Sequence, residues 1–271
     1  MFVELPKYVS RSDKDSRYCE SLYIDDEQNL KIIINELLAH NDEYTYRGVY
    51  DASYKMYSSS QRLWFEDDES MLRFNCKNYY DTIENFIKLV RSQSDVEQYL
   101  KQKEKTDNDF QILVMLQELG LPSPILDFSN ELLKGLFYAV DKMPIWSDRG
   151  TKNLEDYVSL YYISRNIDWE QKEKCFFDLL YNQIRKSGNI FFLPIDDSSF
   201  MSFFNNTKDI PLIEVVNTVC KTKYFHCLNI RKNLVPIIRL YYLQPQGLTD
   251  ELVYPTDDMI YNQLKAVFNQ I

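Results

Sequence analysis

Apolar positions recur every three or four residues in several stretches of this chain, which is the spacing of an amphipathic helix. The clearest stretch is 25–40, where two aspartates precede an apolar stripe that one buried face would require. The same spacing, with weaker support at some ends, predicts further helices over 79–103, 110–119, 132–140, 169–186 and 257–268. Helices therefore account for much of the expected structure.

Shorter apolar runs that are rich in aromatic and β-branched residues predict strands. They cover 125–128, 157–163 and 190–195. Helices interleaved with short strands indicate an α+β fold, a helix-rich single domain around a small central sheet. We expect the whole chain to form this domain, with a helical extension over 1–40, a core over 41–250 and a C-terminal helix over 251–271.

Two local features mark where helices begin. Ser129 or Asn130 directly precedes the 132–140 helix, and both residue types are favoured as helix caps. The stretch 231–243 gives mixed signals, because Pro236 would either kink a helix or begin one. The sequence leaves both alternatives for Pro236 open.

The chain is acidic, with a formal net charge of -10 and a pI near 4.9. This balance opposes binding to the phosphate backbone of duplex nucleic acid and to anionic membrane surfaces, so we expect neither partner. A local basic pocket remains compatible with this acidic net charge. The chain contains only 6 Gly, which argues against a long glycine-rich phosphate loop.

Five cysteines are scattered along the chain without CxxC spacing, and only two histidines are present. We interpret the cysteines as free thiols and expect no metal site. Cys227 follows His226, but adjacent side chains diverge, so a packed thiol is a better interpretation than a nucleophile. The first residues lack the pattern of a signal peptide, and no run of 18 apolar residues occurs, which predicts a cytoplasmic protein.

Two segments resemble the FRG domain family, named for Phe-Arg-Gly. Tyr46-Arg47-Gly48 is similar to the signature tripeptide, with tyrosine in place of phenylalanine. The segment 116–140, LQELGLPSPILDFSNELLKGLFYAV, resembles the longer family motif, which reads Leu-Gln-His-Tyr-Gly-Leu-Pro-Thr-Arg-Leu-Leu-Asp-Trp-Thr before a helix. Arg239 and Gln246-Gly247 add a weaker likeness. The chain departs from the motif at Glu118, where the family has histidine, and at Ser123-Pro124, where it has Thr-Arg.

The resemblance implies a pocket for a small anionic ligand or a nucleotide. Arg47 offers a planar guanidinium for a phosphate or carboxylate, beside the N-terminus of the 132–140 helix, whose free amides favour negative charge. The ligand-binding residues that we expect are Arg47, Gly48, Gln117, Asp127 and Ser129. The alternative is that Arg47 and Asp127 pair with each other and only lock two strands together.

The order of these motifs is also similar to ADP-ribosyltransferases. That resemblance implies NAD as the cofactor, with Arg47 holding its phosphates, Ser129 on the nicotinamide side and Gln246 near the position of a late glutamate. The glutamate itself is missing from that position; Glu251 lies close by in the sequence. Two functions therefore remain open, an NAD-dependent transferase with Arg47, Ser129 and Gln246 as catalytic residues, and a ligand- or protein-binding module of the same fold without chemistry.

Overall fold

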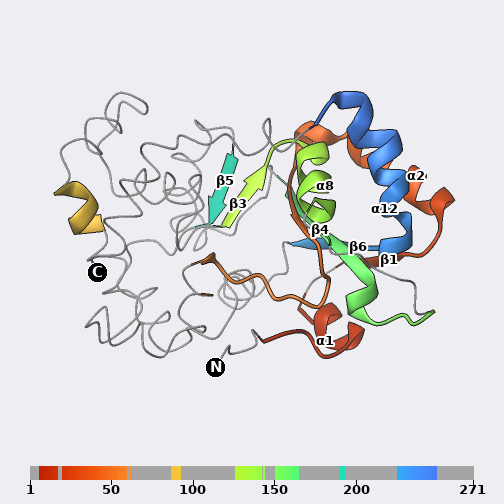
Figure 1. Ribbon diagram of the computed structural model, residues 1–271, viewed down its shortest axis with the longest axis horizontal. Coiled ribbons are helices and arrows are strands. Elements are labelled where there is room, and N and C mark those ends of the chain that lie inside the picture. Colours follow the sequence, from red (N-terminus) through yellow and green to blue (C-terminus); the bar gives the residue numbers. More distant parts are fainter. Residues whose placement is uncertain are drawn as a thin grey trace.

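A computed structural model describes residues 6–17, 20–59, 62, 87–92, 126–141, 143, 150–164, 189–192 and 225–248. Within these ranges the chain forms one mixed sheet with helices on both sides (Figure 1). The predicted α+β fold is confirmed. No helix in this part of the chain is long and apolar enough to cross a membrane.

In the described ranges, six strands build the sheet in the order β1-β6-β4-β2-β3-β5. Their bounds are Glu20–Ile24 for β1, Tyr44–Val49 for β2, Leu126–Ser129 for β3, Tyr157–Ser164 for β4, Asn189–Phe192 for β5 and His226–Arg231 for β6. β1 and β6 run parallel, and the other pairs are antiparallel. β2 therefore lies inside the sheet between β3 and β4.

Three helices cover one side of the sheet, which we call the helix-covered face (Figure 1). They are α2 (Glu27–Ala39), α8 (Leu132–Val140) and α12 (Val235–Ile238), the last extended by a π-helix, η4 (Arg239–Leu243), and a 3-10 turn, η5 (Gln244–Gln246). Apolar side chains from these helices and from β2, β4 and β6 form the core. Fully buried members include Leu30, Leu136, Leu160 and Ile238.

The other side of the sheet is occupied by α1 (Arg11–Asp15), a single turn close to the start of the chain (Figure 1). Ser10 caps this turn, because its side chain accepts a hydrogen bond from the Asp13 amide at 3.1 Å. The described chain also includes the 3-10 turns η1 (Asn41–Glu43), η2 (Leu154–Asp156) and η3 (Lys232–Leu234).

The predicted helix over 25–40 and the strand over 157–163 are confirmed as α2 and β4. The strand predicted over 125–128 is confirmed as β3, and β5 covers part of the strand predicted over 190–195. The predicted helices over 110–119, 169–186 and 257–268 lie outside the described residues. Of the helix predicted over 79–103, the described part is helical over 87–91.

The prediction that Ser129 or Asn130 caps the 132–140 helix is wrong. Glu131 is the N-cap residue of α8, and its side chain makes no capping bond. The Leu132 amide donates instead to Asn41 Oδ1 at 2.8 Å, while Ser129 Oγ accepts from the Glu131 amide at 3.0 Å. A residue 91 positions away thus satisfies the free amide, which no local sequence rule indicates. Pro236, for its part, stands in the first turn of α12 and begins the helix.

Candidate functional site

Arg47 lies within β2, and the packing of its neighbours determines which face of the sheet it occupies. A Cβ atom added to Gly48 would lie 2.1 Å from the Gly135 carbonyl oxygen, and one added to Gly135 would lie 2.7 Å from the Tyr46 Cβ. Tyr46 and Gly48 therefore both face α8. Because successive side chains of a strand alternate between faces, Arg47 points to the opposite side of the sheet, away from α8.

This opposite side, which we call the polar face, consists of Arg47 with residues of β4 and β6. Arg47 is paired with Tyr161, and Tyr161 with Cys227. The next pair on the same face is Ser159 and Asn229. Paired residues of neighbouring strands point to the same side, so a guanidinium, a phenol, a thiol, a hydroxyl and an amide share this face. All except Arg47 are buried.

Lys14 of α1 reaches into the polar face, and its side chain is 0% exposed. Its Nζ donates to Ser159 Oγ at 2.7 Å, to Asn229 Oδ1 at 2.8 Å and to the Ala52 carbonyl oxygen at 2.9 Å. The same atom lies 5.1 Å from the centre of the Tyr161 ring. Burial lowers the pKa of Lys14 below its usual value, because these partners do not fully replace water around the charge.

A hydrogen-bond network links the remaining groups around Lys14. Asn229 Oδ1 accepts from Ser159 Oγ at 2.8 Å and from Cys227 Sγ at 3.4 Å, and Asn229 Nδ2 donates to Ser21 Oγ at 2.9 Å. Burial raises the pKa of the Cys227 thiol, which favours the neutral form. Cys227 is free and buried, so its interpretation as a packed thiol is confirmed.

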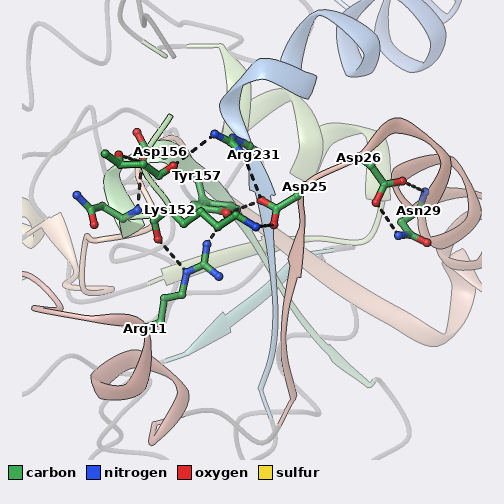
Figure 2. Close-up of polar contacts among 10 residues, drawn as sticks. Arg11, Asp25, Asp26, Asn29, Lys152, Asp156, Tyr157 and Arg231 are labelled. Atoms are coloured by element: carbon green, nitrogen blue, oxygen red, sulfur yellow. Dashed lines mark hydrogen bonds and ion pairs between the residues drawn. The ribbon is translucent and has the colours of Figure 1, made fainter. Parts of the chain in front are cut away.

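A second cluster lies at the edge of the same face and joins α1 to the ends of three strands (Figure 2). The Arg11 guanidinium carbon lies 4.1 Å from the centre of the Tyr23 ring and 4.7 Å from that of Tyr157. Arg11 also donates to the Tyr157 hydroxyl, which in turn donates to Asp25. Two aromatic rings and a phenol-carboxylate pair therefore hold Arg11 in place.

Lys152 and Arg231 complete the charge balance around Asp25 (Figure 2). Lys152 Nζ lies 2.9 Å from Asp25 Oδ2, and Arg231 lies 3.9 Å from Asp25 Oδ1. Burial alone would raise the pKa of Asp25, but hydrogen bonds from Tyr157 and Lys152 and the nearby positive charges lower it. Burial and the bond to Asp25 raise the pKa of Tyr157 to about 12. At neutral pH, Asp25 is thus a carboxylate and Tyr157 a neutral donor.

The predicted site residues lie in three places. Ser129 is paired with Tyr46 across β2 and β3, so it points to the side that α8 covers, opposite to Arg47. Asp127 lies on β3, next to β2, and its backbone is paired with Phe191 of β5. The structure thus brings Arg47, Asp127 and Ser129 to neighbouring strands, with Arg47 and Ser129 on different faces.

Gly48 and Gln246 lie apart from the polar face, and Gln117 lies outside the described residues. Gly48 meets the backbone of α8, where a Cβ atom would lie only 2.2 Å from the Ala139 amide nitrogen. The glycine of the signature tripeptide therefore lets strand and helix approach closely. Gln246 is an exposed residue of η5, at the end of the helical segment that follows β6.

The residues that fill the polar face were not predicted from the sequence. Ser159 and Asn229 interrupt apolar stretches of β4 and β6, and that interruption was the available signal. Lys14 gave no signal, because a lysine in a short charged helix is usually exposed. In the part of the chain described by the structure, no three His, Cys, Asp or Glu side chains are grouped to hold a metal ion.

Comparison with known proteins gives a family match over part of the chain. The family model of the FRG domain matches residues 42–145, which include β2, β3 and α8. This match confirms the resemblance that the two sequence segments indicated. No curated protein and no solved structure matches the chain significantly.

Proposed function

We propose, from the premise that residues 42–145 of this chain form an FRG domain, that the protein binds an anionic ligand through Arg47 at the polar face. The class of ligand that fits is a nucleotide or a related molecule with a phosphate group. In this proposal Arg47, the signature arginine, binds the phosphate, and Gly48, the signature glycine, lets β2 pack closely against α8.

The position of Arg47 and Lys14 on the same face, each next to Tyr161, carries this proposal. Arg47 is paired with Tyr161, whose ring centre lies 5.1 Å from Lys14 Nζ. Two cationic side chains therefore occupy one face of the sheet, in a protein whose formal net charge is -10. Among the described residues, the three acceptors that bind Lys14 are all neutral, and the carboxylates that act on its charge, Asp15 and Asp51, make no hydrogen bond to it.

The chemistry of the side chains on this face supports a phosphate. A guanidinium offers parallel N–H donors that match two phosphate oxygens, with greater geometric selectivity than an ammonium. Thr45 lies two residues before Arg47 on the same face, fully buried, and its hydroxyl makes no hydrogen bond to any residue that the structure describes. A buried hydroxyl favours a partner, because leaving it unpaired costs about 1–3 kcal/mol.

We infer binding without group transfer as the better-supported function. In the transferase alternative, Ser129 acts on the same ligand as Arg47, yet the register pairs Ser129 with Tyr46 on the other face. The Ser129 hydroxyl also accepts a hydrogen bond from the Glu131 amide. NAD remains among the ligands to be tested, because its pyrophosphate suits Arg47 whether or not a reaction follows.

Thermal unfolding with and without ligand tests the proposal. The protein is heated with pyrophosphate, ADP-ribose or NAD, and a ligand that binds only the folded state at a hundred times its dissociation constant stabilises it by about 2.7 kcal/mol. We expect stabilisation of the wild type, loss of the effect in Arg47→Ala, and partial retention in Arg47→Lys. Lys31→Ala removes an exposed cation of α2, on the other side of the sheet, and should respond like the wild type.

Two outcomes would contradict this function. The first is that none of the three ligands stabilises the wild type, or that Arg47→Ala responds equally. The second concerns chemistry, which is followed with NAD labelled in its nicotinamide ring. Release of nicotinamide, abolished by Ser129→Ala, would overturn the inference of binding without transfer and restore the transferase alternative.

A further inference from the structure

The segment 6–17, which we call the strap, lies against the polar face from outside the sheet. It carries α1, which Figure 1 shows on the side opposite to α2, α8 and α12. The Tyr8 amide donates to the Ser53 carbonyl oxygen at 2.8 Å, and Lys7 pairs with Tyr54 as an isolated β-bridge. The strap therefore runs along the segment that follows β2 before α1 crosses to β4 and β6.

Two basic side chains fasten the strap at different points. Lys14 is held by neutral oxygens of Ser159, Asn229 and Ala52 inside the polar face. Arg11 lies against two tyrosine rings at the edge. It also donates through Nε to the Lys152 carbonyl oxygen at 3.0 Å (Figure 2). Both fastenings depend on polar and cation–π contacts rather than on apolar packing.

The strap buries little apolar surface of its own. Tyr8 is its one buried hydrophobic residue, whereas Val9 is 88% exposed. Local opening is favoured where few apolar contacts must be broken. Detaching the strap therefore costs mainly the contacts of Lys14 and Arg11 and leaves the core on the helix-covered face intact.

The inner fastening lies next to Arg47. Lys14 Nζ meets the ring of Tyr161, and Tyr161 is the residue paired with Arg47 on the neighbouring strand. Tyr8, another residue of the strap, lies near the same ammonium, with its ring centre 5.8 Å from Lys14 Nζ. Residues of the strap thus occupy the part of the polar face that borders Arg47 on the β4 side.

We propose that the strap is a gate over Arg47, closed by Lys14 and Arg11, and that it must detach for an anion to reach the guanidinium from the β4 side. This inference rests on the proposed function, since it regulates the same site. When the strap opens, Lys14 leaves its three acceptors and moves away from Tyr161, which uncovers the approach to Arg47. When the strap closes, Lys14 is buried again and the approach to Arg47 from the β4 side is covered.

The gate can be tested without a ligand, by measuring how fast phenylglyoxal modifies the Arg47 guanidinium. Arg11→Gln removes the outer fastening, and we expect modification of Arg47 and amide hydrogen exchange across 7–17 both to rise about tenfold, because a cation–π and a charge-assisted contact are lost. Arg239, exposed on the other side of the sheet, is the internal reference. Lys31→Gln removes a distant exposed cation and should change neither rate.

A second variant, Lys14→Met, removes the inner fastening and should raise the same two rates. Its unfolding transition is recorded first, so that a general loss of structure is recognised by equal acceleration at Arg239. The gate is overturned if exchange across 7–17 rises while modification of Arg47 stays at the wild-type rate. It is also overturned if neither variant changes either rate.

Failure of the gate and failure of the proposed function give different results. If Arg47 becomes more reactive in both variants but ADP-ribose stabilises none of the proteins, the strap covers Arg47 and the proposed ligand class is wrong. If ADP-ribose binds through Arg47 and its association rate is the same in Arg11→Gln as in the wild type, the function stands and the gate fails. An increase in that rate supports both.

Discussion

The two faces of the sheet arise from the same strands but differ in what they bury. On β4, Leu160 faces α8 and belongs to the apolar core, whereas its neighbour Ser159 binds Lys14 on the polar face; both are 0% exposed. On β6, Leu228 and Asn229 repeat this contrast. One strand thus provides a face that stabilises the fold and a face that holds charge.

This difference between the two faces separates residues that stabilise the fold from residues whose burial stability alone does not explain. Apolar burial stabilises a protein by about 25 cal/mol for each Å² removed from water. A buried polar network often stabilises a protein less than apolar side chains of similar volume would at the same place. The polar face is therefore the costlier solution for the same sheet, which supports its assignment to ligand binding rather than to stability.

The close contact of β2 with α8 gives the largest expected effect on the helix-covered face. Gly48→Ala places a Cβ atom 2.1 Å from the Gly135 carbonyl oxygen, and that backbone cannot rotate away as a side chain can. We expect a loss of about 3 kcal/mol or more in the free energy of unfolding, at the upper end of overpacking. Urea denaturation measures it.

Gly247→Ala is the matched control for this substitution. Gly247 has a φ of 62°, and no atom lies within 4 Å of an added Cβ. Alanine there meets backbone strain alone, which costs about 1–2 kcal/mol. Equal losses in the two variants would mean that α8 moves away from β2 and that the helix-covered face is not closely packed at Gly48.

Leu160→Ala and Ser159→Ala compare the two faces at adjacent positions. Leu160→Ala should cost about 2–5 kcal/mol, as buried leucines do when a cavity remains. Ser159→Ala removes one of three acceptors from Lys14 and should cost about 1–3 kcal/mol. If Ser159→Ala proves the more destabilising in urea denaturation, the polar face is a structural centre, and its assignment to ligand binding loses support.

The sequence predicted the elements of the helix-covered face well because their patterns are periodic. Leu30, Ile34 and Leu37 recur on one side of α2 and are buried there, as the spacing requires. The aromatic and β-branched run of β4 gave the strand with nearly its observed bounds. Burial of one face requires apolar residues at regular spacing, so these elements can be predicted from the sequence alone.

The polar face could not be predicted in the same way, because its residues come from distant parts of the chain. Lys14 meets Asn229 across 215 positions, and the cap of α8 by Asn41 spans 91. Neither pairing has a local pattern. The motif did locate Arg47, but its face became known only through the contacts of Tyr46 and Gly48 with α8. Strand register decides such questions, and a single chain does not reveal it.

At the edge of the polar face, Tyr157→Phe tests the contacts around Asp25. Phenylalanine keeps the ring against Arg11 but removes the hydroxyl between Arg11 and Asp25. We expect a loss of about 2 kcal/mol in the free energy of unfolding at pH 7, as for a hydrogen bond to a charged group. Tyr241→Phe, an exposed tyrosine of η4, is the control and should change little.

The difference between wild type and Tyr157→Phe should depend on pH. In the folded protein the pKa of Tyr157 is raised to about 12 from its usual 10.0, so the unfolded chain loses this proton first as pH rises. The contribution of the hydroxyl is complete below pH 10 and should shrink by about 1 kcal/mol between pH 10 and pH 11. A difference that is constant over this interval would place the Tyr157 hydroxyl in solvent.

The smallest effect is expected at the N-terminus of α8, where a polar contact serves the helix-covered face. Asn41 Oδ1 accepts the Leu132 amide at 2.8 Å, and Asn41→Ala leaves that amide unpaired. Loss of a cap costs about 1 kcal/mol, and Asn41→Asp, which keeps the acceptor, should retain most of it. Because α8 packs on β2 beside Gly48, the alanine variant should also raise hydrogen exchange in the first turn of α8 without changing exchange in the strap. Equal acceleration in both segments would mean that the two faces do not open independently.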